Sequence, residues 1–461
     1  DGNIVLTLSG NATKAEYQAL IDSITFKNTS ENPTTDTRTI TVTVNDGALD
    51  SAAASTSVTV VPVNDAPTAI NNGTGISFTE GDAGTTLAGK VTIGDVDNDN
   101  LQSGKVTLVG TQAGDELSVG APNANITVTS SVVDGNIVLT LTGNATKAEY
   151  QALIDSITFK NTSDNPTTND RSITVTVNDG ALNSAASSTA VTVVPVNDAP
   201  VLDLNGPAGG ANSTTIFTEG NSALKVMPFM TITDPDSPTF KGATVTLTNP
   251  QDNDQLYFAT TNAKITVTSA TVDGKLVFTL TGEATQAEYN DVLKSLRFIN
   301  NSDNPSVVNR VIDVTVNDGT DTSKAAQAII KVVAVNDAPT VGTAAATGTE
   351  DTPLVFKWSD FGISDVDTAT SALGIKITAL PSGGDLQYQS ANGTWVTLTS
   401  SDVGKAISYA DIAAGKLQFV PAADKSGSSD YSTAGVGDQK SIYSQLAFSA
   451  TDGGTVATPA P

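Results

Sequence analysis

Acidic side chains recur at fixed spacings along this chain of 461 residues, and their types and spacing could do chemistry. In three stretches a Glu is followed, fifteen residues later, by the first Asp of an Asp-x-Asp pair. Two carboxylates one residue apart in a loop, with a backbone carbonyl between them, can bind one hard cation through oxygen at about 2.3–2.6 Å. The residues are Glu80 with Asp95 and Asp97, Glu219 with Asp234 and Asp236, and Glu350 with Asp365 and Asp367.

A second group of acids repeats just as regularly. In it an acid is followed, fifteen residues later, by an Asp that precedes a Gly, and a Val-Asn-Asp-Ala-Pro phrase comes next. The alternative interpretation is that these Asp and Asn residues only build turns and helix caps. The members are Glu31 and Asp46, Asp164 and Asp179, Asp303 and Asp318, Asp452 in the last stretch, and the pairs Asn64-Asp65, Asn197-Asp198 and Asn336-Asp337.

Composition excludes several classes of function. The chain has 49 Asp and Glu against 23 Lys and Arg, a formal charge of −26, which argues against nucleic acid or an anionic membrane as a partner. It has no Cys and no His, so Ser-His, Cys-His and imidazole-zinc chemistry are excluded. The acids either form a merely solvated surface or are neutralised by divalent cations, and their fixed positions favour the cations.

The Val-Asn-Asp-Ala-Pro phrase divides the chain into a tandem array. It ends at Pro67, Pro200 and Pro339, and a period this long indicates a whole domain per repeat. Residues 1–67 match 134–200 almost residue for residue, so they are predicted to be the C-terminal half of a repeat. The predicted domains are 1–67, 68–200, 201–339 and a divergent block, 340–461, that is expected to lack its end.

The elements that must position these acids are short β-strands. Apolar and polar residues alternate along 105–108, 125–128, 173–177 and 191–193, with Asp-Gly and Asn-Gly turns between the strands, which predicts all-β, antiparallel β-sandwich domains. One short helix interrupts each repeat. Thr146 and Glu149 form a capping box, and the apolar face is predicted to comprise Tyr150, Leu153, Ile154 and Ile157, with equivalents in the other repeats such as Ile24 and Leu296.

Strand direction sorts the acids between the two ends of a repeat. The first strand runs from the linker to the Glu, and the next strand returns to the Asp-x-Asp loop. The Glu therefore belongs to the C-terminal end of its repeat, and the Asp-x-Asp pair belongs to the N-terminal end. Each linker is expected to collect acids from the domains on both sides.

The linker phrase, the Glu, the Asp-x-Asp pair and the Asp before the final strand resemble, in this order, the motifs of cadherin repeats. The chain is most similar to the bacterial cadherin-like modules of giant RTX-type surface adhesins. The resemblance implies Ca²⁺ bound at each junction between domains, with the number of ions per junction left open, and a rod of cadherin-like (Ig-like) sandwiches.

Carried onto this sequence, the resemblance implies three sets of metal ligands. The first set is Glu31, Asn64, Asp65, Asp95, Asp97 and Asp179. The second set is Glu80, Asp164, Asn197, Asp198, Asp234, Asp236 and Asp318. The third set is Glu219, Asp303, Asn336, Asp337, Asp365, Asp367 and Asp452, and Asp99 is an outer candidate for the first set.

The favoured function is a non-enzymatic extender of a bacterial cell-surface adhesin, with calcium ions and neighbouring repeats of the same chain as its partners. Paired carboxylates can indicate a glycosidase. Here the pairs recur in every repeat and lie at linkers, whereas an active site would not be repeated in this way. Two alternatives stay open: a subunit of a self-associating extracellular fibre or biofilm matrix, which would add identical chains as partners, and a ligand-binding module in 340–461, where Trp395 could stack on a sugar. Each places the protein outside the cell, on a bacterial surface or in a secreted matrix.

Overall fold

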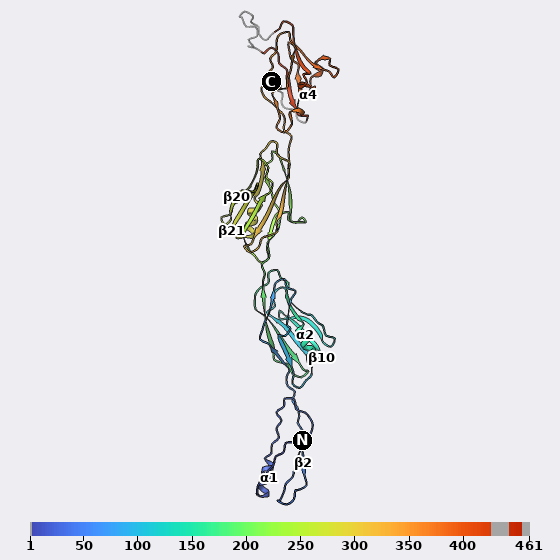
Figure 1. Ribbon diagram of the computed structural model, residues 1–461, viewed down its shortest axis with the longest axis vertical. Coiled ribbons are helices and arrows are strands. Elements are labelled where there is room, and N and C mark those ends of the chain that lie inside the picture. The colour runs from blue at the N-terminus through green and yellow to red at the C-terminus, as the bar shows by residue number, and fades with distance from the viewer. Residues whose placement is uncertain (1, 426–441, 454–461) are drawn as a thin grey trace. The chain divides into compact units, whose positions relative to one another are not determined.

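The computed structural model describes residues 2–425 and 442–453 and confirms an all-β chain of tandem sandwiches, each with a short helix (Figure 1). It forms two compact units, residues 1–197 and 198–461, which are described separately. None of the helices in the described ranges has the length and apolar character needed to span a lipid bilayer.

In the first unit, residues 68–197 form a sandwich of a six-stranded and a three-stranded sheet. The larger sheet has the order β4-β13-β12-β7-β10-β9, the smaller β5-β11-β8, and β3 pairs with β6. All pairs are antiparallel except β4 with β13, which is parallel. The bounds are β3 Thr68–Asn71, β4 Ile76–Thr79, β5 Thr85–Thr86, β6 Val91–Gly94, β7 Asn100–Val109, β8 Asp115–Val119, β9 Thr127–Val133, β10 Asn136–Thr146, β11 Ile157–Asn161, β12 Arg171–Asn178 and β13 Ser187–Val194.

Residues 2–67 of the same unit have fewer strands than their near-identical counterpart, 134–200. They contain α1 (Lys14–Asp22) and the hairpin of β1 (Arg38–Val42) with β2 (Ala54–Val58). Apolar side chains that are buried in the counterpart are exposed here: Val5 is 77% exposed, whereas Val138 is 3% exposed. The sequence match therefore carries over the helix but not the burial, because the strands of 134–200 bury their apolar side chains together with strands of 68–133, such as β7.

In the second unit, residues 198–339 repeat the strand order of the first sandwich. The sheets are β15-β24-β23-β18-β21-β20 and β16-β22-β19, with β14 paired to β17, and the equivalent pair β15–β24 is again parallel. The bounds are β14 Val201–Asp203, β15 Ser213–Thr218, β16 Leu224–Lys225, β17 Thr231–Thr233, β18 Thr239–Leu247, β19 Asp254–Phe258, β20 Thr266–Val272, β21 Lys275–Thr285, β22 Leu296–Asn300, β23 Arg310–Asn317 and β24 Ala326–Val333.

The last block has a different sandwich. Its sheets are β26-β32-β29-β30 and β31-β28-β33, with β25 paired to β27, and Trp358 packs against Phe361 and Tyr409 at the edge of the core. The bounds are β25 Thr340–Val341, β26 Leu354–Val355, β27 Ile363–Ser364, β28 Gly374–Ala379, β29 Gly384–Gln389, β30 Trp395–Thr397, β31 Ala406–Ser408, α4 Tyr409–Ala413, β32 Leu417–Pro421 and β33 Ala447–Thr451, with 3₁₀ turns at Trp358–Phe361, Thr370–Ala372 and Ser400–Asp402.

The helices α2 (Lys147–Asp155) and α3 (Gln286–Lys294) begin with the predicted capping boxes. The hydroxyl of Thr146 accepts from the N–H of Glu149 at 3.2 Å, and the carboxylate of Glu149 accepts from the N–H of Thr146 at 2.9 Å. The prediction that Ile157 belongs to the helix is wrong, because the helix ends at Asp155, with Ser156 as its C-cap, and Ile157 pairs with Val119 in β11. The same correction holds for Ile24 and Leu296, which follow the ends of α1 and α3.

The capping box gives a pH-dependent contribution to stability. The N–H of Thr146, with the side chain of Asn125, lowers the pKa of Glu149 to about 2 from an ordinary 4.5. Since the folded-state pKa is depressed, the contribution is present above pH 4.5 and is lost as pH falls toward 2. We expect Glu149→Gln to lower the unfolding midpoint at pH 6, and the difference from wild type to shrink toward pH 3.

Thermal unfolding of the two proteins between pH 6 and pH 3 measures this effect. Glu116→Gln, at an exposed position of β8, removes the same charge without touching a helix cap and is the matched control. A Glu149→Gln difference that stays constant with pH would contradict the prediction.

A buried ion pair joins the two sheets of each full repeat. Arg171 at the start of β12 contacts Asp115 at the start of β8 at 2.8 Å, and both side chains are 0% exposed. Arg310 and Asp254 form the equivalent pair at 2.9 Å in the third repeat. Arg171 also donates to the carbonyls of Thr167 and Asn169, both at 2.8 Å. The loop before β12 therefore supplies further hydrogen-bond acceptors for the buried guanidinium.

Candidate metal centres

The strand order shared by the second and third repeats places the first glutamate of each beside the linker that leaves that repeat. Glu80 follows β4, which runs parallel to β13, and the N–H of Val196 donates to Oε2 of Glu80 at 2.8 Å. Glu219 follows β15 in the same way, and the N–H of Val335 donates to its Oε2 at 2.7 Å. One oxygen of each carboxylate is thus bonded to the linker backbone.

The Asp-x-Asp loops turn back on themselves at the opposite end of each repeat. In the first loop, Oδ1 of Asp95 accepts from the N–H groups of Asp97 at 3.1 Å and Asn98 at 2.9 Å. The N–H of Asp65, in the preceding linker, donates to Oδ2 of Asp97 at 2.9 Å. The same linker bond joins Asp198 to Asp236 at 3.1 Å and Asp337 to Asp367 at 2.9 Å.

The first set of predicted ligands is brought together within residues 1–197, apart from Glu31. The amide of Asn64 donates to Oδ2 of Asp179 at 2.8 Å, so the linker contacts both the Asp-x-Asp loop and the turn after β12. Glu31 is exposed, and its neighbour Asn32 makes the contact instead, donating to the carbonyl of Val96 at 3.1 Å.

The third set lies within residues 198–461, and all seven residues belong to contacts around one linker. Single carboxylate oxygens of Glu219, Asp303 and Asp337 lie within 4.8 Å of one another. The amide of Asn336 donates to Asp452 in the turn after β33. The N–H of Asp337 donates to Asp367 of the Asp365–Asp367 loop. Carboxylates that precede and follow the linker in the sequence therefore lie beside the linker.

The second set is divided between the two units. Glu80, Asp164 and Asn197 belong to residues 1–197, where Glu80 bonds Val196. Asp198, Asp234, Asp236 and Asp318 belong to residues 198–461, where Asp198 bonds Asp236 and Asp318 accepts from the N–H of Thr320 at 2.6 Å. The joint site of this set stays a prediction.

Carboxylate oxygens at equivalent positions are buried without a hydrogen-bond donor among the described residues. In each Asp-x-Asp loop, one oxygen of the first Asp accepts backbone N–H groups and the other has no donor. A buried, unsatisfied polar group is unfavourable by about 1–3 kcal/mol, and more when it is charged. The oxygens are Oδ2 of Asp95, Asp234 and Asp365, Oδ1 of Asp236 and Asp367, and Oε1 of Glu219.

This donor set fits a hard divalent cation. All the facing side chains offer oxygen, and the sequence has no His or Cys that would favour zinc or copper. Calcium takes six to eight such oxygens, including carboxylates, amide side chains and backbone carbonyls, in flexible geometry. The side-chain amides of Asn64 and Asn336 lie beside these carboxylates. The residues present therefore fit Ca²⁺ better than they fit a softer metal.

Burial and backbone hydrogen bonds, with smaller contributions from neighbouring carboxylates, shift the pKa values of these acids. Burial, together with the neighbouring Asp236, raises the pKa of Asp234 to about 6, and burial also raises the pKa of Asp95. The N–H of Asp65 lowers the pKa of Asp97, although the nearby charge of Asp179 opposes this. A bound cation would favour the charged form of every one of these groups.

Some residues that contact the linkers and the Asp-x-Asp loops were not predicted from the sequence. Asn98 donates to Oδ1 of Asn64 at 2.8 Å, and Asn304 donates to the carbonyl of Val366 at 3.0 Å, as Asn32 does to Val96. A sequence signal for Asn32 and Asn304 exists, because Asn-Pro follows the acid at Glu31, Asp164 and Asp303. Asp99, the outer candidate, has a fully exposed side chain and lies 3.8 Å from Lys147.

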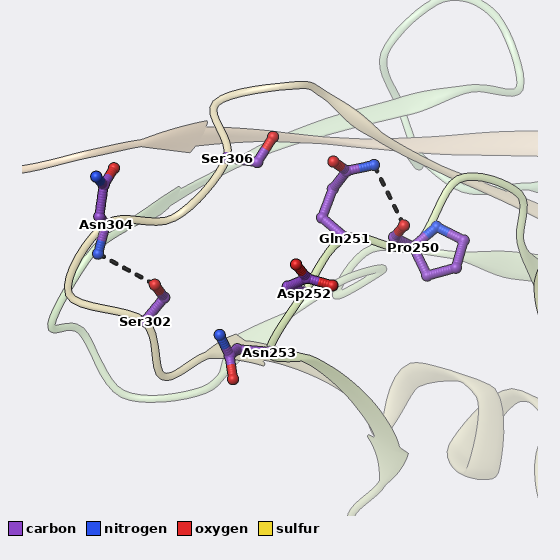
Figure 2. Close-up of a pocket in the computed structure, with 7 residues that line it drawn as sticks. All are labelled: Pro250, Gln251, Asp252, Asn253, Ser302, Asn304 and Ser306. Carbon is purple, nitrogen blue, oxygen red and sulfur yellow. Dashed lines mark hydrogen bonds between the residues drawn. The ribbon is translucent and has the colours of Figure 1, made fainter. Parts of the chain in front are cut away.

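A shallow hollow of about 350 Å³ lies between two loops of the third repeat, at residues 250–253 and 302–306 (Figure 2). Amide and hydroxyl groups line it, and Asp252 is the one charged residue of its lining. Gln251 donates to the carbonyl of Pro250 at 3.2 Å, and the N–H of Asn304 donates to Ser302 at 3.1 Å. With one exposed carboxylate, the hollow holds no acid–base pair for catalysis.

No family model matches the chain, and no curated protein matches it. Among solved structures, it is similar to protocadherin gamma B2 extracellular cadherin domains 1–5, with 15% identity, a TM-score of 0.34, and coverage of 88% of this chain and 61% of that one. It is also similar to human CDH23 EC21–23, with 13% identity, a TM-score of 0.31 and coverage of 85% and 96%.

A bacterial structure, the surface layer protein SbsC, domains 4–9, matches with 13% identity, a TM-score of 0.16 and coverage of 68% of this chain and 38% of that one. At these TM-scores none of the similarities carries an argument about function.

Proposed function

We propose that the chain is a non-catalytic extender segment of a bacterial surface adhesin, placed outside the cell, in which Ca²⁺ braces the junctions between the domains 1–67, 68–200, 201–339 and 340–461. The observation that carries the proposal is the recurrence, in three Asp-x-Asp loops, of a buried carboxylate oxygen that lacks a donor. Turns alone do not require such an oxygen, because a capping carboxylate is satisfied by the amides it accepts.

The chain's own residues hold the linker from both sides. Glu219 accepts the N–H of Val335 before the Asn-Asp pair, and Asp367 accepts the N–H of Asp337 within it. Each of these carboxylates keeps a second oxygen, buried and without a donor, for another ligand. When bound, calcium supplies the positive charge that lets carboxylates of both domains approach.

Without the cation, the same carboxylates repel one another. Unit charges about 4 Å apart interact by roughly 1 kcal/mol in water and by about 4 kcal/mol near a protein surface. Glu219, Asp303 and Asp337 have oxygens within 4.8 Å of one another, so their charges repel with energies somewhat below these values. We infer that the linker flexes without calcium and stiffens with it, which suits a segment that extends a distal binding domain.

Small-angle X-ray scattering of the full chain tests the proposal. We expect the maximum dimension to increase, and the flexibility to decrease, when EDTA is replaced by millimolar calcium. Millimolar magnesium is the matched control, since Mg²⁺ demands a stricter octahedral site and gives up its water reluctantly. An unchanged maximum dimension in calcium and in EDTA would contradict the proposal, and regular filaments in calcium would favour a self-associating fibre instead.

A further inference from the structure

The first residue of the helix in each full repeat braces the Asp-x-Asp loop of that repeat. In the second repeat, Nζ of Lys147 donates to the carbonyl of Asp95 at 2.7 Å. In the third repeat, Nε2 of Gln286 donates to the carbonyls of Asp234 at 3.0 Å and Ser237 at 2.9 Å. Both side chains follow the capping threonine of their helix, so the capping box fixes where each brace begins.

The two braces make the same kind of bond but differ in charge. Lys147 carries a positive charge, and its side chain is only 28% exposed. Its ion partner Asp99 lies 3.8 Å away with a fully exposed side chain, so water screens that carboxylate and it offsets the ammonium only in part. At the equivalent positions the third repeat has neutral Gln286 and Pro238.

We propose that the first residue of the helix sets the calcium affinity of the Asp-x-Asp loop to which it is hydrogen-bonded. Lys147 would weaken calcium binding at Asp95 and Asp97. The inference rests on the proposed function, since it takes calcium to be the ligand. The ammonium is hydrogen-bonded to the backbone of the ligand loop, so it adds cation–cation repulsion that the neutral amide of Gln286 does not add. Lys147 acts here as a positioning residue, and its charge opposes the ion that its bond helps to place.

A site-resolved calcium titration of the full chain tests the inference. Hydrogen exchange followed by mass spectrometry gives the calcium concentration at which each loop becomes protected, for residues 95–99, 234–238 and 365–369 separately. We expect Lys147→Gln to lower the midpoint of the 95–99 loop about three- to tenfold, because a neutral brace remains and the repulsion is gone. The reciprocal Gln286→Lys should raise the midpoint of the 234–238 loop by a similar factor.

Two controls separate the charge from the hydrogen bond. Lys147→Arg keeps the charge and a donor, so it should retain the wild-type midpoint, and the 365–369 loop should not respond to any of these replacements. Thermal midpoints in EDTA report whether each variant folds as wild type does.

If Lys147→Gln and Lys147→Arg give the same midpoint for the 95–99 loop, the charge has no role and the inference is wrong, while calcium binding itself would stand. If none of the three loops gains protection in calcium, the proposed function fails first.

Discussion

Replacing Arg310 with Ala is expected to lower the free energy of unfolding of the third repeat by about 3–5 kcal/mol. Arg310 is 0% exposed and contacts the buried carboxylate of Asp254 at 2.9 Å. Removing the guanidinium leaves Asp254 charged, buried and short of a partner, and it opens a gap between the sheets. The guanidinium also donates to the carbonyls of Ser306 and Val308, so the loop before β23 loses its anchor as well.

The loss can be measured by hydrogen exchange of the β23 amides in increasing urea, which reports the stability of this repeat alone. Arg297→Ala is the matched control, because Arg297 is half-buried and its guanidinium makes a single long bond among the described residues, at 3.5 Å to the carbonyl of Ala223. We expect the control to change stability by less than about 1 kcal/mol. A double replacement, Asp254→Leu with Arg310→Met, should recover most of the loss, since an apolar pair leaves no buried charge.

A comparable loss in Arg297→Ala would show that the β23 measurement does not report the ion pair. If Arg310→Ala were itself nearly neutral, Asp254 would have to be reached by water or protonated in the folded protein. This second result would contradict the idea that the pair holds the two sheets together.

The second large effect is expected at the third linker. Calcium at 100 to 1,000 times its dissociation constant stabilises a single-site protein by about 2.7–4.1 kcal/mol. Asp337→Asn removes one charged ligand at the point where Glu219 and Asp303 converge, and we expect calcium affinity there to fall on the order of ten- to hundredfold. The calcium-dependent rise in unfolding temperature should shrink accordingly.

In EDTA the sign of the Asp337→Asn effect should reverse. Without a cation, the replacement removes one of three mutually repelling carboxylates, so the variant should be no less stable than wild type. Asp273→Asn, in the exposed turn between β20 and β21, also removes one negative charge but lies outside the predicted ligand sets. Equal calcium-dependent shifts for Asp337→Asn and Asp273→Asn would count against a metal site at this linker.

The predictability of the fold differed between its elements for physical reasons. The start of α2 follows from Thr146 and Glu149, because a capping box is a local motif. The end of α2 could not be predicted in this way, because the helical spacing of apolar residues continues to Ile157, although that residue belongs to β11. Strand alternation identified β12 and β13, but it carries no information on partners, so the parallel pairing of β4 with β13 was not predicted.

The candidate site was predicted in part for similar reasons. Its carboxylates recur at a spacing of fifteen residues, which the sequence displays directly. Their backbone partners, such as the N–H groups of Val196 and Val335, have no side-chain signal and emerged only from the fold. The buried pair of Asp115 and Arg171 was missed because 56 residues separate its members and each looks locally like a surface charge.

The parallel pairing of β4 with β13 has a mechanical consequence. Tension on a repeat enters at its N-terminal end, near β4, and leaves at its C-terminal end, after Val194 of β13. Two parallel strands pulled from opposite ends slide past each other, so their hydrogen bonds are loaded in shear and must break together rather than one after another. The repeat should therefore yield at a higher force than a hairpin unzipped from its end.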